Sequence, residues 1–209
     1  MKEFSVTMSL MDYIPVFLFL AGTILLLQDV YSRLKKGAFV LFAAGTVNIF
    51  TAGFLKATYK LLYAMGVCDF EPLNALFFPL QSIGFLLAGI AMVMYMCGKK
   101  KNDGVRVCSV AAVPVLWKGT FLFISLMIAG LAGMCAGLIK LCVNLKKKRA
   151  SLLFVVTFIC SCCMGYLSSK SFDKAIWNWI AEGINVIGQG CFLLGAIAIH
   201  KGLKAETEV

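Results

Sequence analysis

Long apolar segments separated by short basic loops constrain this chain more than any other feature of its sequence. The segments begin near residues 12, 38, 72, 121, 150 and 173. Each is long enough for a helix that crosses a bilayer, which needs about 20 residues. Backbone polar groups must be satisfied inside hydrocarbon, so the spans are expected to be helical. The sequence therefore predicts an all-α, polytopic integral membrane helix bundle.

Composition supports this class and limits what lies outside the membrane. Of the 209 residues, 61% are hydrophobic and 14% are charged, whereas soluble domains are about 45–50% apolar and about 25% charged. The polar stretches near 98–104, 144–151 and after 201 are too short for a soluble domain, which needs about 50 residues. We therefore expect a single membrane domain over residues 1–209.

The net charge of +10 comes from basic residues that cluster in the loops between apolar segments. In a soluble protein such a charge would suggest nucleic acid, but loop lysines beside membrane spans determine topology and contact anionic lipid headgroups. We therefore expect membrane lipids, and no nucleic acid, as partners of the basic loops.

A polar stripe marks the last apolar segment, which runs from about residue 173 to 201. Asn178, Glu182, Asn185 and Gln189 are separated by steps of four, three and four residues, so they project from one helical face. Ionisable groups inside a membrane normally face the bundle interior or a water-filled cavity. We expect these four side chains to bind or couple a solute; the alternative is that they hold neighbouring helices together by hydrogen bonds.

Further polar candidates lie in the first half of the chain. Asn74 and Gln81 are seven residues apart in the third segment and share a helical face, with Pro79 between them. Asn48 lies in the second segment. We expect Asn74 and Gln81 to face the same cavity from the side opposite the last segment, and Asn48 to add a hydrogen-bond donor to the site.

The two halves of the chain also resemble each other. We expect a three-helix repeat over about 12–97 and again over about 121–201, joined by a linker helix at about 105–117. This three-plus-one-plus-three plan has about seven transmembrane helices; six spans are the alternative. Under the repeat, Ala38 aligns with Ala150, Phe42 with Phe154, and Phe85 with Phe192.

Charge distribution favours seven spans over six. Six spans would divide the 20 Lys and Arg residues equally between the two faces, whereas seven spans place fourteen of them on one face. Because short cytoplasmic loops are enriched in Lys and Arg, the asymmetric arrangement is preferred. We expect the N-terminus outside and the C-terminus in the cytoplasm, in a bacterial cytoplasmic membrane.

This plan is similar to that of the SWEET and PQ-loop carriers and of nicotinamide riboside carriers. The similarity is one of architecture, because the Pro-Gln signature of the PQ-loop proteins is incomplete. Leu27-Gln28 precedes the first basic loop without the proline, and Ile139-Lys140 replaces the signature in the second half. The chain is therefore not assigned to these families.

We expect a small transporter that moves a small polar or zwitterionic solute through a central cavity, with proton coupling through Glu182. The alternatives are a solute channel and a membrane sensor or scaffold that binds a ligand without transport. We expect no enzyme, cofactor or metal site, since His200 is the single histidine and no catalytic motif is present. The small-residue ridge that contains Gly133 and Gly137 is compatible with packing inside one chain or in a homo-oligomer.

Overall fold

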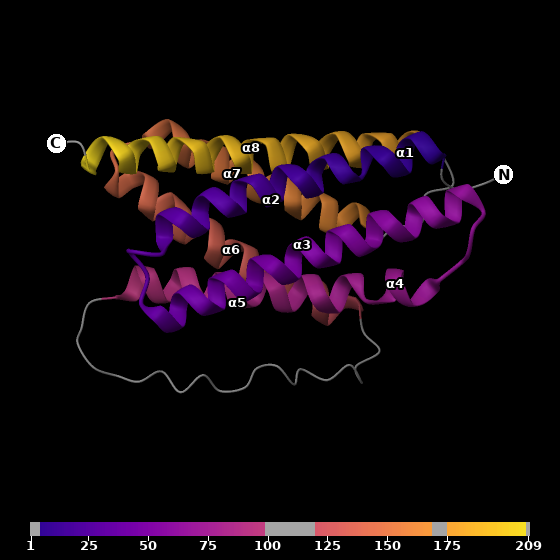
Figure 1. Ribbon diagram of the computed structural model, residues 1–209, viewed down its shortest axis with the longest axis horizontal. Coiled ribbons are helices and arrows are strands. Elements are labelled where there is room, and N and C mark those ends of the chain that lie inside the picture. The colour runs from indigo at the N-terminus through magenta and orange to yellow at the C-terminus, as the bar shows by residue number, and fades with distance from the viewer. Residues whose placement is uncertain (1–4, 99–119, 169–174, 208–209) are drawn as a thin grey trace.

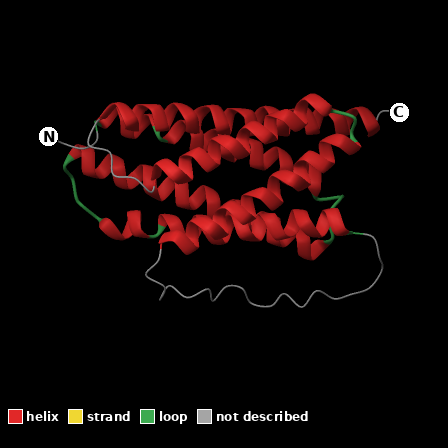
Figure 2. Ribbon diagram, turned by 180° about the vertical axis from the view of Figure 1, so that it is seen from behind, coloured by secondary structure: helices red, strands yellow, loops and turns green. Residues whose placement is uncertain are grey.

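The protein is described here by a computed structural model, which defines residues 5–98, 120–168 and 175–207. All regular structure in these residues is helical (Figure 2). Six helices or helix pairs are long and apolar enough to cross a membrane, which makes this a multi-pass membrane protein. The elements are α1 (Val6–Met11), α2 (Tyr13–Val30), α3 (Lys36–Met65), α4 (Glu71–Ala75), α5 (Phe77–Cys97), α6 (Thr120–Asn144), α7 (Lys148–Ser168) and α8 (Ala175–Thr207).

Local sequence signals explain where several helices begin and end. The hydroxyl group of Ser5 accepts a hydrogen bond of 3.2 Å from the Met8 N–H and caps α1. Helix α3 ends at Gly66, whose φ of 72° lies in the left-handed region that glycine adopts without strain. Pro79 lies in the first turn of α5, where its missing N–H leaves no helical hydrogen bond unmade.

The helices form a closed ring. Each span packs on the next one in the order α2, α3, α5, α6, α7 and α8, and α8 returns to pack on α2. The short helix α1 continues into α2 and packs on the last turns of α3 (Figure 1). Because the ring closes, it surrounds a central space to which every span has access.

Helices α5 and α6 are neighbours that run in the same direction. The Ser82 hydroxyl donates a 2.7 Å hydrogen bond to the carbonyl of Phe123 near their beginnings. The Asn144 amide donates a 3.3 Å hydrogen bond to the Tyr95 hydroxyl near their ends. It follows that α5 ends and α6 begins at opposite ends of the bundle (Figure 1). The expected linker helix at 105–117 lies outside the described residues.

Helices α2 and α8 form a second parallel pair. The rings of Phe19 and Phe192 stack at 5.1 Å halfway along the pair. Closer to the C-terminal ends, Asp29 Oδ1 lies 2.8 Å from His200 Nδ1. The parallel course brings the first and last spans together along most of their length.

Glycines permit the close approach of α5 and α6. Gly130 lies directly against the backbone of Phe85 and Gly89, and Gly133 also faces Gly89. Gly137 faces Met92, where a Cβ atom would stand 2.5 Å from that of the methionine. The ridge of Gly133 and Gly137 thus packs within one chain.

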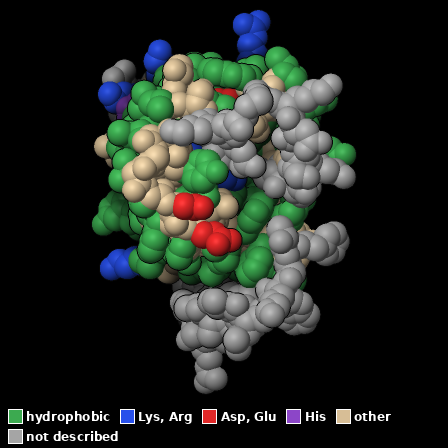
Figure 3. Space-filling model, turned by 90° about the vertical axis from the view of Figure 1, so that its right-hand side faces the viewer, with side chains coloured by type: hydrophobic (Ala, Val, Ile, Leu, Met, Phe, Trp, Pro, Cys, Tyr) green, Lys and Arg blue, Asp and Glu red, His purple; other side chains and the backbone are tan. Residues whose placement is uncertain are grey.

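Charge is distributed unequally between the two ends of the bundle. All described Lys and Arg residues except Lys56 and Lys60 lie near the end where α2, α5, α6 and α8 finish, which we call the basic end. The opposite end, which we call the acidic end, carries Asp69 and Glu71 in and before α4. Seen from there, hydrophobic side chains cover the flanks and acidic side chains lie near the middle of the face (Figure 3).

Candidate functional site

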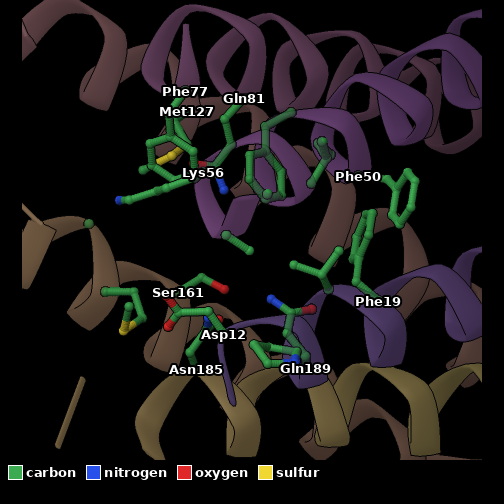
Figure 4. A pocket seen from close by; sticks show the side chains of 18 of the residues that line it. Asp12, Phe19, Phe50, Lys56, Phe77, Gln81, Met127, Ser161, Asn185 and Gln189 are labelled. Carbon is green, nitrogen blue, oxygen red and sulfur yellow. The ribbon is translucent and has the colours of Figure 1, made fainter. Parts of the chain in front are cut away.

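A cavity of ≈ 140 Å³ occupies the acidic half of the ring, and all six spans contribute to its walls. It is similar in size to an engineered cavity of about 150 Å³ that holds benzene. This cavity is therefore large enough for a small organic molecule or a few waters. Figure 4 shows its side chains arranged around an open centre.

Helix α8 presents three of its four predicted polar residues to the cavity. Glu182, Asn185 and Gln189 line the wall, as their helical spacing requires. Glu182 is the most buried of them, with an exposed fraction of 6%. Asn178 is half-buried and does not belong to the lining of the cavity. The polar edge of α8 thus borders a void.

Of the three residues predicted from the first half of the chain, one lines the cavity and two do not. Gln81 of α5 lines the cavity and lies across it from Gln189 (Figure 4). Asn74 is exposed in α4, because the helix is interrupted at Leu76 and does not continue through the segment as one face. Asn48 is half-buried on α3 and does not line the cavity.

A buried ion pair that sequence reasoning missed forms part of the wall. Asp12 Oδ2 lies 2.7 Å from Lys60 Nζ, and the Asp12 side chain is only 8% exposed. Both residues line the cavity. In the sequence Asp12 resembles the polar flank of an apolar segment. The signal that could have indicated this pair is the four-residue spacing of Lys56 and Lys60, which puts two lysines on one helical face.

Contacts between α1 and α3 hold this pair in place. The buried Ser9 hydroxyl donates a 3.1 Å hydrogen bond to the carbonyl of Lys60. The hydroxyl groups of Tyr13 and Thr58 lie 2.9 Å apart, on either side of the same interface. These contacts join the junction of α1 and α2 to the last turns of α3, so Asp12 reaches Lys60 directly.

Glu182 lies beside the ion pair. Its carboxyl group lines the same cavity as that of Asp12, close enough for their charges to interact, and its Oε1 atom is buried with no hydrogen-bond donor among the described residues. Two carboxylates at close range repel each other, so the arrangement favours a cation or a proton between them. The site therefore has an acidic side with unused acceptor capacity.

Lys56 supplies an amino group elsewhere in the same cavity. Its Nζ lies 3.8 Å from the centre of the Phe77 ring and 5.8 Å from that of Phe78, within the range of a cation–π interaction. Figure 4 shows it on the side opposite Asp12 and Asn185. The cavity thus has carboxyl groups on one wall and the Lys56 amino group on the facing wall.

Aromatic side chains close the cavity toward the basic end. Phe19 and Phe85 line its floor. Phe192 is fully buried; its ring stacks on Phe19 and contacts that of Phe154 at 6.1 Å. A second hollow at the basic end, beside Leu34, has no room for a water molecule. In the described residues the cavity ends at this aromatic floor.

Comparison of the chain with protein-family models, with curated proteins and with solved structures gives no match. The functional interpretation therefore depends on the geometry of the cavity alone.

Proposed function

We propose that this protein is a small membrane transporter that moves a small polar or zwitterionic solute through the central cavity. The observation that carries the proposal is the position of Glu182, Asn185 and Gln189 on a cavity bounded by all six spans. Buried amides and carboxylates are costly in a membrane unless they have partners or line a wet space. Here they line a space of the size of a small solute.

The shape of the cavity favours a carrier over an open channel. The cavity is confined to the acidic half, and its floor of Phe19 and Phe85, with Phe192 packed beneath Phe19, separates it from the basic end. A carrier exposes its site to one side at a time, and this arrangement corresponds to a state closed toward the basic end. Release on that side requires α2 and α8 to separate at the floor.

Glu182 is the proposed coupling group. Glu182 and Asp12 line the same cavity and carry carboxyl oxygens without donors among the described residues, so one proton or one cation can be bound there. A proton bound there changes the charge that faces the solute, so solute and proton occupancy become linked. Asn185, Gln189 and Gln81 are the proposed solute contacts.

The proposed topology has seven spans in a bacterial cytoplasmic membrane, with the N-terminus outside and the C-terminus in the cytoplasm. The parallel course of α5 and α6 supports an odd number of crossings, because α5 ends at the basic end and α6 begins at the acidic end. The concentration of lysines at the basic end supports a cytoplasmic position for that end.

The proposed internal repeat is supported by two contacts between corresponding helices. A Cβ atom at Gly22 of α2 would stand 2.9 Å from the ring of Phe192 in α8. Gly130 of α6 lies against the backbone of Phe85 and Leu86 in α5. The first helix of each half therefore packs, through a glycine, on the Phe-Leu-Leu segment in the third helix of the other half.

Reconstitution tests the proposal. Purified protein in proteoliposomes is exposed to amino acids, glycine betaine, urea, glycerol and glucose, and flux is followed with and without an inward proton gradient. We expect at least one solute to be transported faster with the gradient, and Glu182→Gln to remove that difference while the protein stays folded. Glu71→Gln, at an exposed acid of the same end, is the matched control. Unchanged gradient-dependent flux in Glu182→Gln would argue against the coupling role.

A further inference from the structure

We infer that the solute is a small amino acid whose ammonium group lies between Asp12 and Glu182 and whose carboxylate lies beside Lys56. This inference rests on the proposed function and makes its substrate class specific. It also assigns binding roles to Asp12 and Lys56, which neither the polar stripe nor the repeat indicated.

The acidic wall has the chemistry of an ammonium site. Glu182 is more than nine-tenths buried, lines the cavity, and has an Oε1 atom without a donor among the described residues. Asp12 Oδ1 is likewise buried without a donor in this part of the chain. An unsatisfied buried acceptor costs about 1–3 kcal/mol, and more when charged. A primary ammonium group donates three hydrogen bonds and can satisfy both oxygens at once.

The opposite wall has the chemistry of a carboxylate site. Within the described residues Lys56 is in no ion pair, and its Nζ lies over the rings of Phe77 and Phe78. Asp12 is already paired with Lys60. The Lys56 ammonium therefore keeps donors for an anionic group that enters the cavity, as the amide of Gln81 does from the same side (Figure 4).

These two walls exclude the simpler solutes. A solute with only a positive charge would leave Lys56 without an anionic partner. A solute with only a negative charge would lie against the carboxyl groups of Asp12 and Glu182. An uncharged polyol would leave both charged walls poorly satisfied. A zwitterion pairs with both, and Phe50, Phe77 and Met127 leave an apolar surface for a side chain. The volume of ≈ 140 Å³ suits a small aliphatic side chain.

The test compares each amino acid with derivatives that carry only one of its charges. Thermal unfolding of the purified protein is measured in detergent with L-alanine, L-valine or L-leucine, with the corresponding amino-acid amides, and with the N-acetyl amino acids. We expect the free amino acid to stabilise the protein at concentrations at least about tenfold lower than either derivative, since each derivative loses one charged contact.

Two variants should each remove a different part of this selectivity. Lys56→Gln should remove the preference for the free amino acid over its amide, and Glu182→Gln should remove the preference over the N-acetyl form. Lys36→Gln and Glu71→Gln change exposed charges outside the cavity and should leave both preferences intact. A variant that does not fold is replaced by Lys56→Met or Glu182→Met and the comparison is repeated.

The outcomes distinguish a failure of the amino-acid assignment from a failure of the proposed transport function. Equal binding of amide and free amino acid, or selectivity unaffected by Lys56→Gln, would overturn the amino-acid assignment. If amino acids fail to bind while proteoliposomes pass urea, glycerol or glucose, the assignment falls and the transporter stands. If amino acids bind with the expected selectivity but no probe is transported, the binding site stands and the transporter falls.

Discussion

Gly130 of α6 lies so close to Phe85 of α5 that a Cβ atom at Gly130 would overlap the Phe85 backbone carbonyl. The neighbouring atom belongs to the backbone of a packed helix, so it cannot move aside as the end of a flexible side chain would. The contact joins the two halves of the chain beside the cavity floor, where Phe85 lies.

Gly130→Ala should therefore destabilise the bundle by about 1–3 kcal/mol, because overpacked interfaces must separate to admit the extra carbon. Thermal or denaturant unfolding in detergent measures the effect. Gly183→Ala is the matched control, since nothing lies within 4 Å of a Cβ atom there and alanine is the better helix former. Equal stability of the two variants would contradict the close packing of α5 and α6.

The buried pair of Asp12 and Lys60 should behave as a coupled unit. Asp12→Asn or Lys60→Gln alone leaves one charge buried without its partner, a change that typically costs about 3–5 kcal/mol. The double variant removes both charges and should recover part of the loss. A double-mutant cycle by denaturant unfolding measures the coupling. Additive effects of the two substitutions would show that the pair does not act as the geometry indicates.

Two polar contacts to α8 at the basic end, Asp29 with His200 and Arg33 with Glu206, should differ in strength according to burial. The side chain of Asp29 is 7% exposed beside His200, whereas those of Arg33 and Glu206, 2.6 Å apart, are 33% and 52% exposed. His200→Leu leaves a buried carboxylate without its partner and should cost about 1–3 kcal/mol. Arg33→Met breaks an exposed pair and should cost about 0–1 kcal/mol. Denaturant unfolding compares them, and a larger effect of Arg33→Met would refute the ranking.

Thiol labelling tests the orientation of the helices. Cys68 follows α3 at the acidic end and Cys97 ends α5 at the basic end, and both are exposed. In variants that keep one cysteine each, a membrane-impermeant maleimide should label Cys68 in intact bacterial cells and Cys97 only after permeabilisation.

A third single-cysteine variant, Lys147→Cys, separates seven crossings from six. Lys147 is exposed between α6 and α7 at the basic end, so its thiol should be accessible from the same side as Cys97. Labelling of Lys147→Cys and Cys97 from opposite sides would rule out the parallel arrangement of α5 and α6 in the membrane.

The sequence by itself determined the class of the protein and part of the cavity wall. Apolar length sets the helices because a bilayer leaves no other way to satisfy the backbone, and six membrane-crossing helices were found in the described residues. Helical periodicity then placed Glu182, Asn185 and Gln189 on one face, because side-chain direction within a single helix depends only on local geometry.

Only the tertiary structure decided which helices are neighbours and which charges meet. Asp12 and Lys60 come from different helices, and no local pattern encodes the 2.7 Å contact between them. The break at Leu76 turned Asn74 outward, although its spacing to Gln81 fits one continuous helix. The physical reason is common to both: periodicity describes one helix, whereas an enclosed site depends on how glycine contacts, helix breaks and buried ion pairs bring several helices together.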